Sequence, residues 1–132
     1  MSQYRRVQLA AYTYEITFGN LSRETLAQFE TDIAQLQAEI GGHAPHILFL
    51  FDVSANLAPT PYAIQFFTNL RQKGNLIDAP LVKVAVLAKR SMFFGIVENL
   101  INRTLGNEDG TLRLFTEREQ ALRWLKNGLP AL

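Results

Sequence analysis

The side chains best suited to chemistry lie in two polar segments, residues 52–62 and 89–91, each of which follows a run of apolar residues. A carboxylate such as Asp52 can order a loop by accepting hydrogen bonds from backbone N–H groups. The hydroxyl groups of Ser54 and Thr60 are candidate phosphoacceptors, because an added phosphate would change the charge of the loop. Thr60 precedes a proline, so the alternative role is an ordinary helix cap.

The second segment consists of Lys89, Arg90 and Ser91, and it joins an expected strand to an expected helix. Two cations beside the free N–H groups of a helix start form a candidate site for an anion, either a phosphate or a lipid headgroup. The alternative is a solvated basic pair in a loop, and no glycine-rich phosphate loop supports the anion site.

Aromatic residues supply a further candidate surface. Phe66 and Phe67 are adjacent, as are Phe93 and Phe94, so each pair points about 100° apart on its helix. One member of each pair can face a sheet while the other lies toward an edge. Together with Tyr62, the outer members would form an apolar groove or a homodimer interface. The alternative is a thicker core.

The sequence offers no recognisable catalytic residue, metal site or cofactor site. It has no cysteine, and its two histidines, His43 and His46, precede a strand, away from the end where parallel sheets usually bind ligands. Thirteen basic and twelve acidic side chains give no electrostatic case for nucleic-acid binding. Without a signal peptide or an apolar run of about 20 residues, we expect a cytoplasmic protein with no membrane span.

Alternating strands and helices must position these side chains. Strands are expected at 47–51 and 81–88, where the apolar runs indicate burial on both faces, and at 111–115. Residues 7–18 favour extended structure. Their apolar residues change from odd to even positions along the segment, so a bulge or a small hairpin near 10–12 is needed. Four helices are expected from caps and terminating glycines, and they run over 22–41, 60–74, 91–106 and 116–128.

Two helices carry specific end and core signals. Ser22 is the expected N-cap of the first helix, whose apolar stripe comprises Leu26, Phe29, Ile33, Leu36 and Ile40. Thr116 and Glu119 predict a capping box at the start of the last helix, and Trp124 is expected to anchor that helix in the core.

This order predicts an α/β fold in a single domain, with a mixed, mostly parallel sheet of four to five strands and about four helices on both faces. Such sheets bind ligands and partners at the carboxyl ends of their strands. The candidate functional residues are therefore sought in segments 52–62 and 89–91.

Three segments resemble SpoIIAA-like STAS domains. These are the strand and turn over residues 14–22, the hydrophobic strand that ends in Asp52-Val53-Ser54, and the closing segment 115–125, which contains Phe115, Glu119, Ala121, Trp124 and Leu125. The resemblance implies one STAS-type domain over residues 1–132 with the STAS topology. It also implies a bacterial, non-enzymatic regulatory or protein-interaction module, and a homodimer is a further expectation.

One departure from this family bears on the role. Phospho-regulated STAS domains carry Asp-Ser-Ser-Gly at the start of the second helix, where this chain has Thr60-Pro61-Tyr62-Ala63. The resemblance therefore implies a module that binds a partner without the family's phosphoacceptor serine. The alternative hypothesis is a binding protein for a small apolar or anionic, lipid-like ligand, which would use the aromatic residues together with Lys89 and Arg90.

Overall fold

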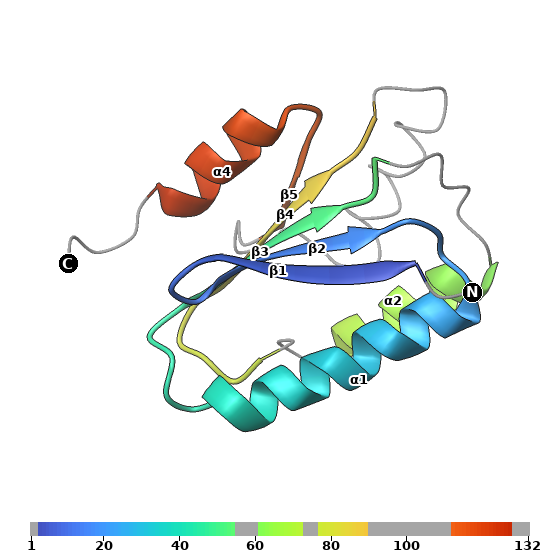
Figure 1. The fold of residues 1–132 in the computed structure, drawn as a ribbon, viewed down its shortest axis with the longest axis horizontal. Helices are drawn as coiled ribbons and strands as arrows, with labels where there is room; N and C mark the ends of the chain where they lie inside the picture. Colours follow the sequence, from blue (N-terminus) through green and yellow to red (C-terminus); the bar gives the residue numbers. More distant parts are fainter. Residues whose placement is uncertain (1–2, 55–60, 73–76, 90–111, 128–132) are drawn as a thin grey trace.

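The computed structural model describes residues 3–54, 61–72, 77–89 and 112–127. These residues form an α/β structure of five strands and three helices (Figure 1). The elements in chain order are β1 (Tyr4–Ala10), β2 (Thr13–Phe18), α1 (Arg23–Ile40), β3 (Ile47–Asp52), α2 (Pro61–Gln72), β4 (Val82–Leu87), β5 (Leu112–Phe115) and α4 (Arg118–Lys126).

The strands form one mixed sheet with the order β1-β2-β3-β4-β5. β1 and β2 are antiparallel, whereas β2–β3, β3–β4 and β4–β5 are parallel pairs. Ile47 on β3 lies opposite Val82 on β4, and the pairing continues to Asp52 and Leu87. The prediction that the two apolar strands are adjacent and parallel is confirmed.

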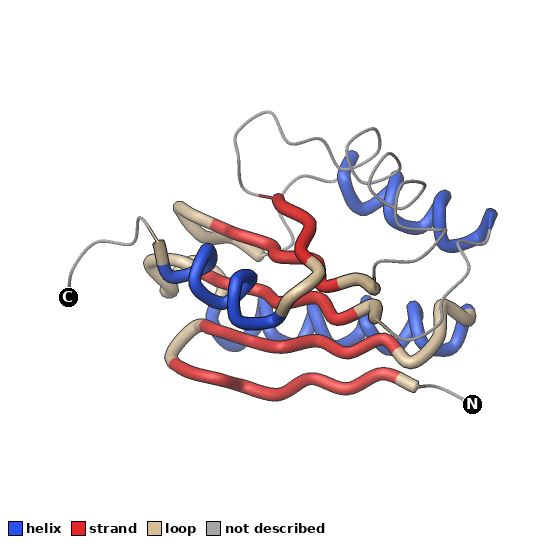
Figure 2. The backbone as a smooth tube through the Cα atoms, turned by 90° about the horizontal axis from the view of Figure 1, so that it is seen from above, coloured by secondary structure: helices blue, strands red, loops and turns tan. Residues whose placement is uncertain are grey.

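Helices cover both faces of the sheet (Figures 1 and 2). Ile47, Phe49 and Phe51 join the core between the sheet and the helices α1 and α2. Leu48 and Leu50 pack with α4 on the opposite face. Successive side chains of a strand point to opposite faces, so a strand between two helical layers must be apolar at every position. This explains the continuous apolar run of β3.

The parity switch near the N-terminus marks a hairpin that also contains a bulge. β1 ends at Ala10, the chain turns at Ala11–Tyr12, and the register shifts between Gln8 and Ala10. Tyr12 adopts a positive φ of 56°, an uncommon conformation for a residue with a side chain. The Tyr12 carbonyl accepts a hydrogen bond from Leu48 N–H at 2.9 Å, which joins the turn to the start of β3.

The ends of α1 confirm the expected caps. The Ser22 hydroxyl accepts a hydrogen bond from Thr25 N–H at 3.2 Å and so caps one of the unpaired donors of the first turn. At the other end, Gly41 N–H donates to Gln37 carbonyl at 2.8 Å, and Gly42 then takes the left-handed φ of 79°. Leu26, Phe29, Ile33 and Leu36 are buried as predicted.

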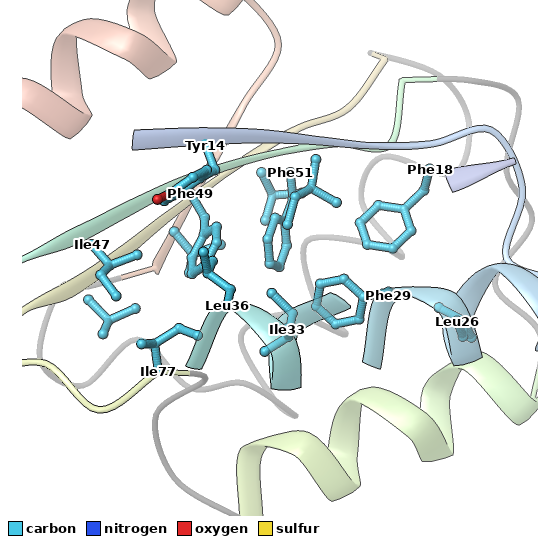
Figure 3. Close-up of a cluster of buried hydrophobic side chains, with 14 of the residues drawn as sticks. Tyr14, Phe18, Leu26, Phe29, Ile33, Leu36, Ile47, Phe49, Phe51 and Ile77 are labelled. Atoms are coloured by element: carbon cyan, nitrogen blue, oxygen red, sulfur yellow. The ribbon is translucent and has the colours of Figure 1, made fainter. Parts of the chain in front are cut away.

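An aromatic cluster forms the centre of the core between the sheet and α1 (Figure 3). The ring of Phe29 lies 5.3 Å from Phe18, 5.6 Å from Phe51 and 6.2 Å from Phe66, measured between centroids. Edge and tilted contacts of this kind add to the burial of apolar area. Phe29 therefore ties α1 to two strands and to α2.

A buried lysine of β4 holds the C-terminal end of α4. Lys83 is 9% exposed, and its ammonium group donates to the carbonyls of Trp124 (2.7 Å) and Asn127 (3.0 Å). The carbonyls of the last helical turn have no partners within the helix, and a cation there also offsets the helix dipole. Desolvation by burial lowers the pKa of Lys83.

Two expectations for α4 are wrong in detail. The N-cap residue is Glu117, which makes no side-chain capping hydrogen bond, so Thr116 and Glu119 do not form the predicted capping box. Trp124 is half-buried at the rim of the core, 5.6 Å from the ring of Phe115 and 4.2 Å from the Lys83 ammonium. Ala121 and Leu125 are the buried anchors instead, because they lie one turn apart on the helix face toward the sheet.

The expected helix at 91–106 lies outside the described residues. Within the described ranges, none of the helices is both long and apolar enough to cross a membrane.

Phe29→Ala should lower the free energy of unfolding by about 3–5 kcal/mol, because it empties the centre of a close-packed cluster. Chemical denaturation monitored by circular dichroism measures this loss. Gln35→Ala, at an exposed position of the same helix, should change stability by less than about 0.5 kcal/mol. Equal effects of the two substitutions would contradict the assignment of Phe29 as the central core residue.

Tyr4 links β1 to α1 through a carboxylate. Its hydroxyl donates to Asp32 Oδ2, which also accepts from Arg6 Nε at 3.1 Å. Burial, followed by the hydrogen bond to Asp32, raises the pKa of Tyr4. The unfolded chain therefore loses this proton near pH 10, while the folded chain retains it.

Tyr4→Phe should lower stability by about 1–2 kcal/mol at neutral pH, because the hydrogen bond to a carboxylate is lost. Above about pH 10 the wild-type protein should lose this advantage, because ionisation of Tyr4 stabilises only its unfolded state. Denaturation of both proteins between pH 7 and pH 11 measures the difference. A difference that stays constant over this range would contradict the raised pKa.

Candidate functional site

The carboxyl ends of the parallel strands bring the candidate residues to one edge of the sheet. Thr17 of β2 lies opposite Asp52 of β3, which lies opposite Leu87 of β4, which in turn lies opposite Phe115 of β5. The helices α1, α2 and α4 each begin after one of these strand ends. We call this row and the segments that follow it the carboxyl edge.

A short turn orders the polar residues after β3. Asp52 Oδ1 accepts hydrogen bonds from Ser54 N–H at 2.9 Å and from the Ser54 hydroxyl at 2.6 Å. Both residues are partly buried. The sequence-based role of Asp52 as a loop-ordering carboxylate is in line with this geometry, and the Ser54 hydroxyl is held in one orientation.

An ion pair from distant parts of the chain lies beside this turn. Arg118, the first residue of α4, contacts Glu15 of β2 through two atoms, with Nη2–Oε1 at 2.8 Å and Nε–Oε2 at 3.3 Å. The hydrogen bond to Glu15 raises the pKa of Arg118, and the charges of Glu15 and Asp52 add to this. Two carboxylates thus share the field of one guanidinium at the carboxyl edge.

The predicted basic segment is only partly described. Lys89 is exposed just beyond β4, where the preceding Ala88 N–H donates to the Phe115 carbonyl at 3.0 Å. The other predicted residues Thr60, Arg90, Ser91 and Phe94 lie outside the described residues, as does the side chain of Phe67. The anion site therefore stays a prediction.

The described aromatic candidates Tyr62 and Phe66 lie on α2, on the α1 side of the sheet. Tyr62 is 37% exposed, and the guanidinium of Arg23 lies 4.6 Å from its ring centre. Phe66 is half-buried between Tyr62 and the core residue Phe29. Phe66 thus extends the core, which favours the alternative of a thicker core for this position.

The described carboxyl edge holds an ordered polar turn and an ion pair. Two of its carboxylates have partners: Glu15 binds Arg118, and Asp52 orders Ser54. The ring of His46 lies 6.0 Å from that of Tyr12 at the opposite, amino end of β3. Within the described residues the histidines are therefore not placed to act as a base for Ser54.

Sequence reasoning did not find Glu15, Arg118 or Arg23 as members of this edge. Glu15 lies between Thr13 and Thr17 in β2, where polar and apolar residues alternate, so it is expected on the face opposite Tyr14 and Ile16. Nothing local indicates that its partner lies 103 residues later in the sequence.

Comparisons with models of known protein families, with curated proteins and with solved structures found no match to this chain. The α/β class follows from the structure itself. The resemblance to SpoIIAA-like STAS domains stays a prediction.

The Glu15–Arg118 pair should contribute little stability despite its two-point geometry, because the Arg118 side chain is 47% exposed. A double-mutant cycle with Glu15→Ala and Arg118→Ala should give a coupling of about 0.2–1 kcal/mol at low salt. This coupling should shrink in about 1 M sodium chloride, where the screening length is about 3 Å. A larger coupling that is insensitive to salt would contradict a solvent-screened pair.

Proposed function

We propose that this chain is a non-enzymatic regulatory or protein-interaction module of SpoIIAA-like type, and that it recognises a protein partner through the carboxyl edge. The observation that carries the proposal is the turn in which Asp52 Oδ1 holds both the N–H and the hydroxyl of Ser54. A rigid polar turn at the end of a central strand is a well-ordered recognition feature, because little conformational freedom is lost when a partner binds it.

The neighbouring charges support the same proposal. Arg118 pairs with Glu15 close enough to Asp52 to be affected by its charge, and Lys89 is exposed just beyond the adjacent strand β4. Fixed charges of both signs around an ordered hydroxyl favour a specific orientation of a polar partner surface. The sequence resemblance points to the same class of module.

A change of charge at Ser54 would alter this surface directly. A negative group on the Ser54 oxygen would lie next to the Asp52 carboxylate, which could no longer accept the hydroxyl hydrogen bond. Like charges at this separation repel, so the turn would open or rotate. This gives the proposed module a local means of regulation.

Ser54→Asp should therefore abolish capture of the partner, while Thr31→Asp, with the same charge change on the exposed face of α1, should leave it intact. Tagged proteins are incubated with lysate of the source cells, and the bound proteins are quantified by mass spectrometry. We expect at least a tenfold loss for Ser54→Asp, equivalent to about 1.4 kcal/mol. Thermal unfolding of both variants controls for folding.

Identical sets of bound proteins for wild type and Ser54→Asp would overturn the carboxyl edge as the binding surface. The alternative of a small apolar or anionic ligand has its own readout. Native mass spectrometry of protein purified from the source cells would then show a mass in excess of one or two chains of 14.9 kDa each.

A further inference from the structure

The outer edge of β1 is a second surface, separate from the carboxyl edge. β1 is the first strand in the order of the sheet, and among the described residues no strand pairs with its outer side. Figure 2 shows β1 running along the rim of the sheet. An edge strand presents unpaired N–H and C=O groups that can hydrogen-bond to another strand.

The residues whose backbone points outward can be identified from the pairing with β2. Gly19 N–H donates to the Gln3 carbonyl at 2.7 Å, so this pair is a hydrogen-bonded one. Hydrogen-bonded and non-hydrogen-bonded pairs alternate along antiparallel strands. The backbone N–H and C=O groups of Tyr4, Arg6 and Gln8 therefore point away from β2.

This edge carries only part of the protection that edge strands usually have, namely the charged side chains of Arg5 and Arg6 and a register shift at its far end. β1 has seven residues, YRRVQLA, with neither proline nor lysine, and its register shift comes only after Gln8. Val7 and Leu9 are two of the three large hydrophobic side chains that are exposed in the described residues, at 36% and 37%. Exposed apolar side chains on an unpaired edge strand favour pairing with another strand.

We propose that β1 pairs with β1 of a second copy of this chain, antiparallel about a two-fold axis at Val7, to form a continuous sheet across a homodimer. In this register Arg6 pairs with Gln8 of the other copy through outward-pointing backbone groups, and Arg5 lies opposite Leu9. Val7 lies opposite Val7, so two exposed apolar side chains cover each other.

Among the registers centred on residues 5 to 7, charge favours the axis at Val7. Moving the two-fold axis to Arg6 or to Arg5 would place arginine opposite arginine, which is destabilising. Moving it toward the C-terminus would centre the pairing on the irregular part of the strand, between Gln8 and Ala10. Arg6 is also held by Asp32 of its own chain, which reduces its repulsion of a second copy.

The proposal differs from the homodimer expected from the sequence, which used the aromatic faces of the helices. Val7 lies opposite Glu15 in the sheet, so the two surfaces are neighbours, but the dimer uses the outer backbone of β1, which the carboxyl edge does not include. A symmetric interface needs one surface that is complementary to itself, and an antiparallel edge strand meets this condition.

A cysteine at position 7 tests the register. The chain has no cysteine, so Val7→Cys introduces a single thiol whose partner would be the same thiol of the other copy. Opposed residues in a non-hydrogen-bonded pair have Cα atoms about 4.5 Å apart, within the range for a disulfide. Mild oxidation should therefore give a covalent dimer for Val7→Cys but not for Leu9→Cys, which is equally exposed but lies opposite Arg5.

Light scattering tests the assembly itself. The wild-type protein should have twice the chain mass of 14.9 kDa. Val7→Arg places like charges across the axis and should weaken the dimer at least tenfold, or by about 1.4 kcal/mol. Gln120→Arg makes the same charge change on an exposed position of α4 and should leave the dimer intact.

A protein that stays monomeric up to roughly 1 mM, the range of the weakest specific complexes, would overturn the proposal. So would a dimer that Val7→Arg does not weaken, or equal cross-linking of Val7→Cys and Leu9→Cys, because each outcome would place the interface elsewhere. Circular dichroism of the variants confirms that each is folded.

Discussion

The parallel pairing of β3 with β4 is the constraint on which the rest of the structure depends. Both strands are apolar on both faces, apart from Lys83 and the terminal Asp52, so neither can lie at an open surface. Helices must cover them above and below. Once they are covered, β2 and β5 can only add on either side, which places β1 at one rim of the sheet.

The two faces of this central pair are built differently. Beneath the sheet, Phe29 and its aromatic neighbours form a close-packed cluster that holds α1 against β2 and β3. Above it, α4 contributes only Ala121 and Leu125 as fully buried residues, and Lys83 adds polar anchoring at the helix end. Among the described residues, the α1 face supplies most of the apolar burial. Both faces carry polar contacts, with Tyr4 and Arg6 on Asp32 at the α1 face and Lys83 on the end of α4 at the other.

The two proposed surfaces lie at different places on this sheet. Side chains at positions such as Glu15 and Asp52 point toward the α4 face, where Arg118 at the helix start can reach them. Beyond the reach of α4, β1 keeps its outer edge and the side chains of Val7 and Leu9 accessible. One surface offers ordered polar groups, and the other offers backbone hydrogen bonds and apolar contact.

The sequence by itself determined the type and order of the described elements, the buried stripe of α1 with its Ser22 cap, and the two inner strands. These features are encoded by local periodicity and by residues with strong backbone preferences. The capping box at Thr116 failed because the choice of N-cap depends on how the helix joins the sheet, which a local pattern does not contain.

Only the tertiary structure decided which polar side chains meet. Glu15 and Arg118 are 103 residues apart in the sequence. Their contact depends on strand order and register, and not on the residues next to either of them in the sequence. The half-buried position of Trp124, the anchoring by Lys83 and the outward backbone of β1 arise in the same way. Each depends on which elements pack against each other, because burial and pairing are properties of the assembled sheet.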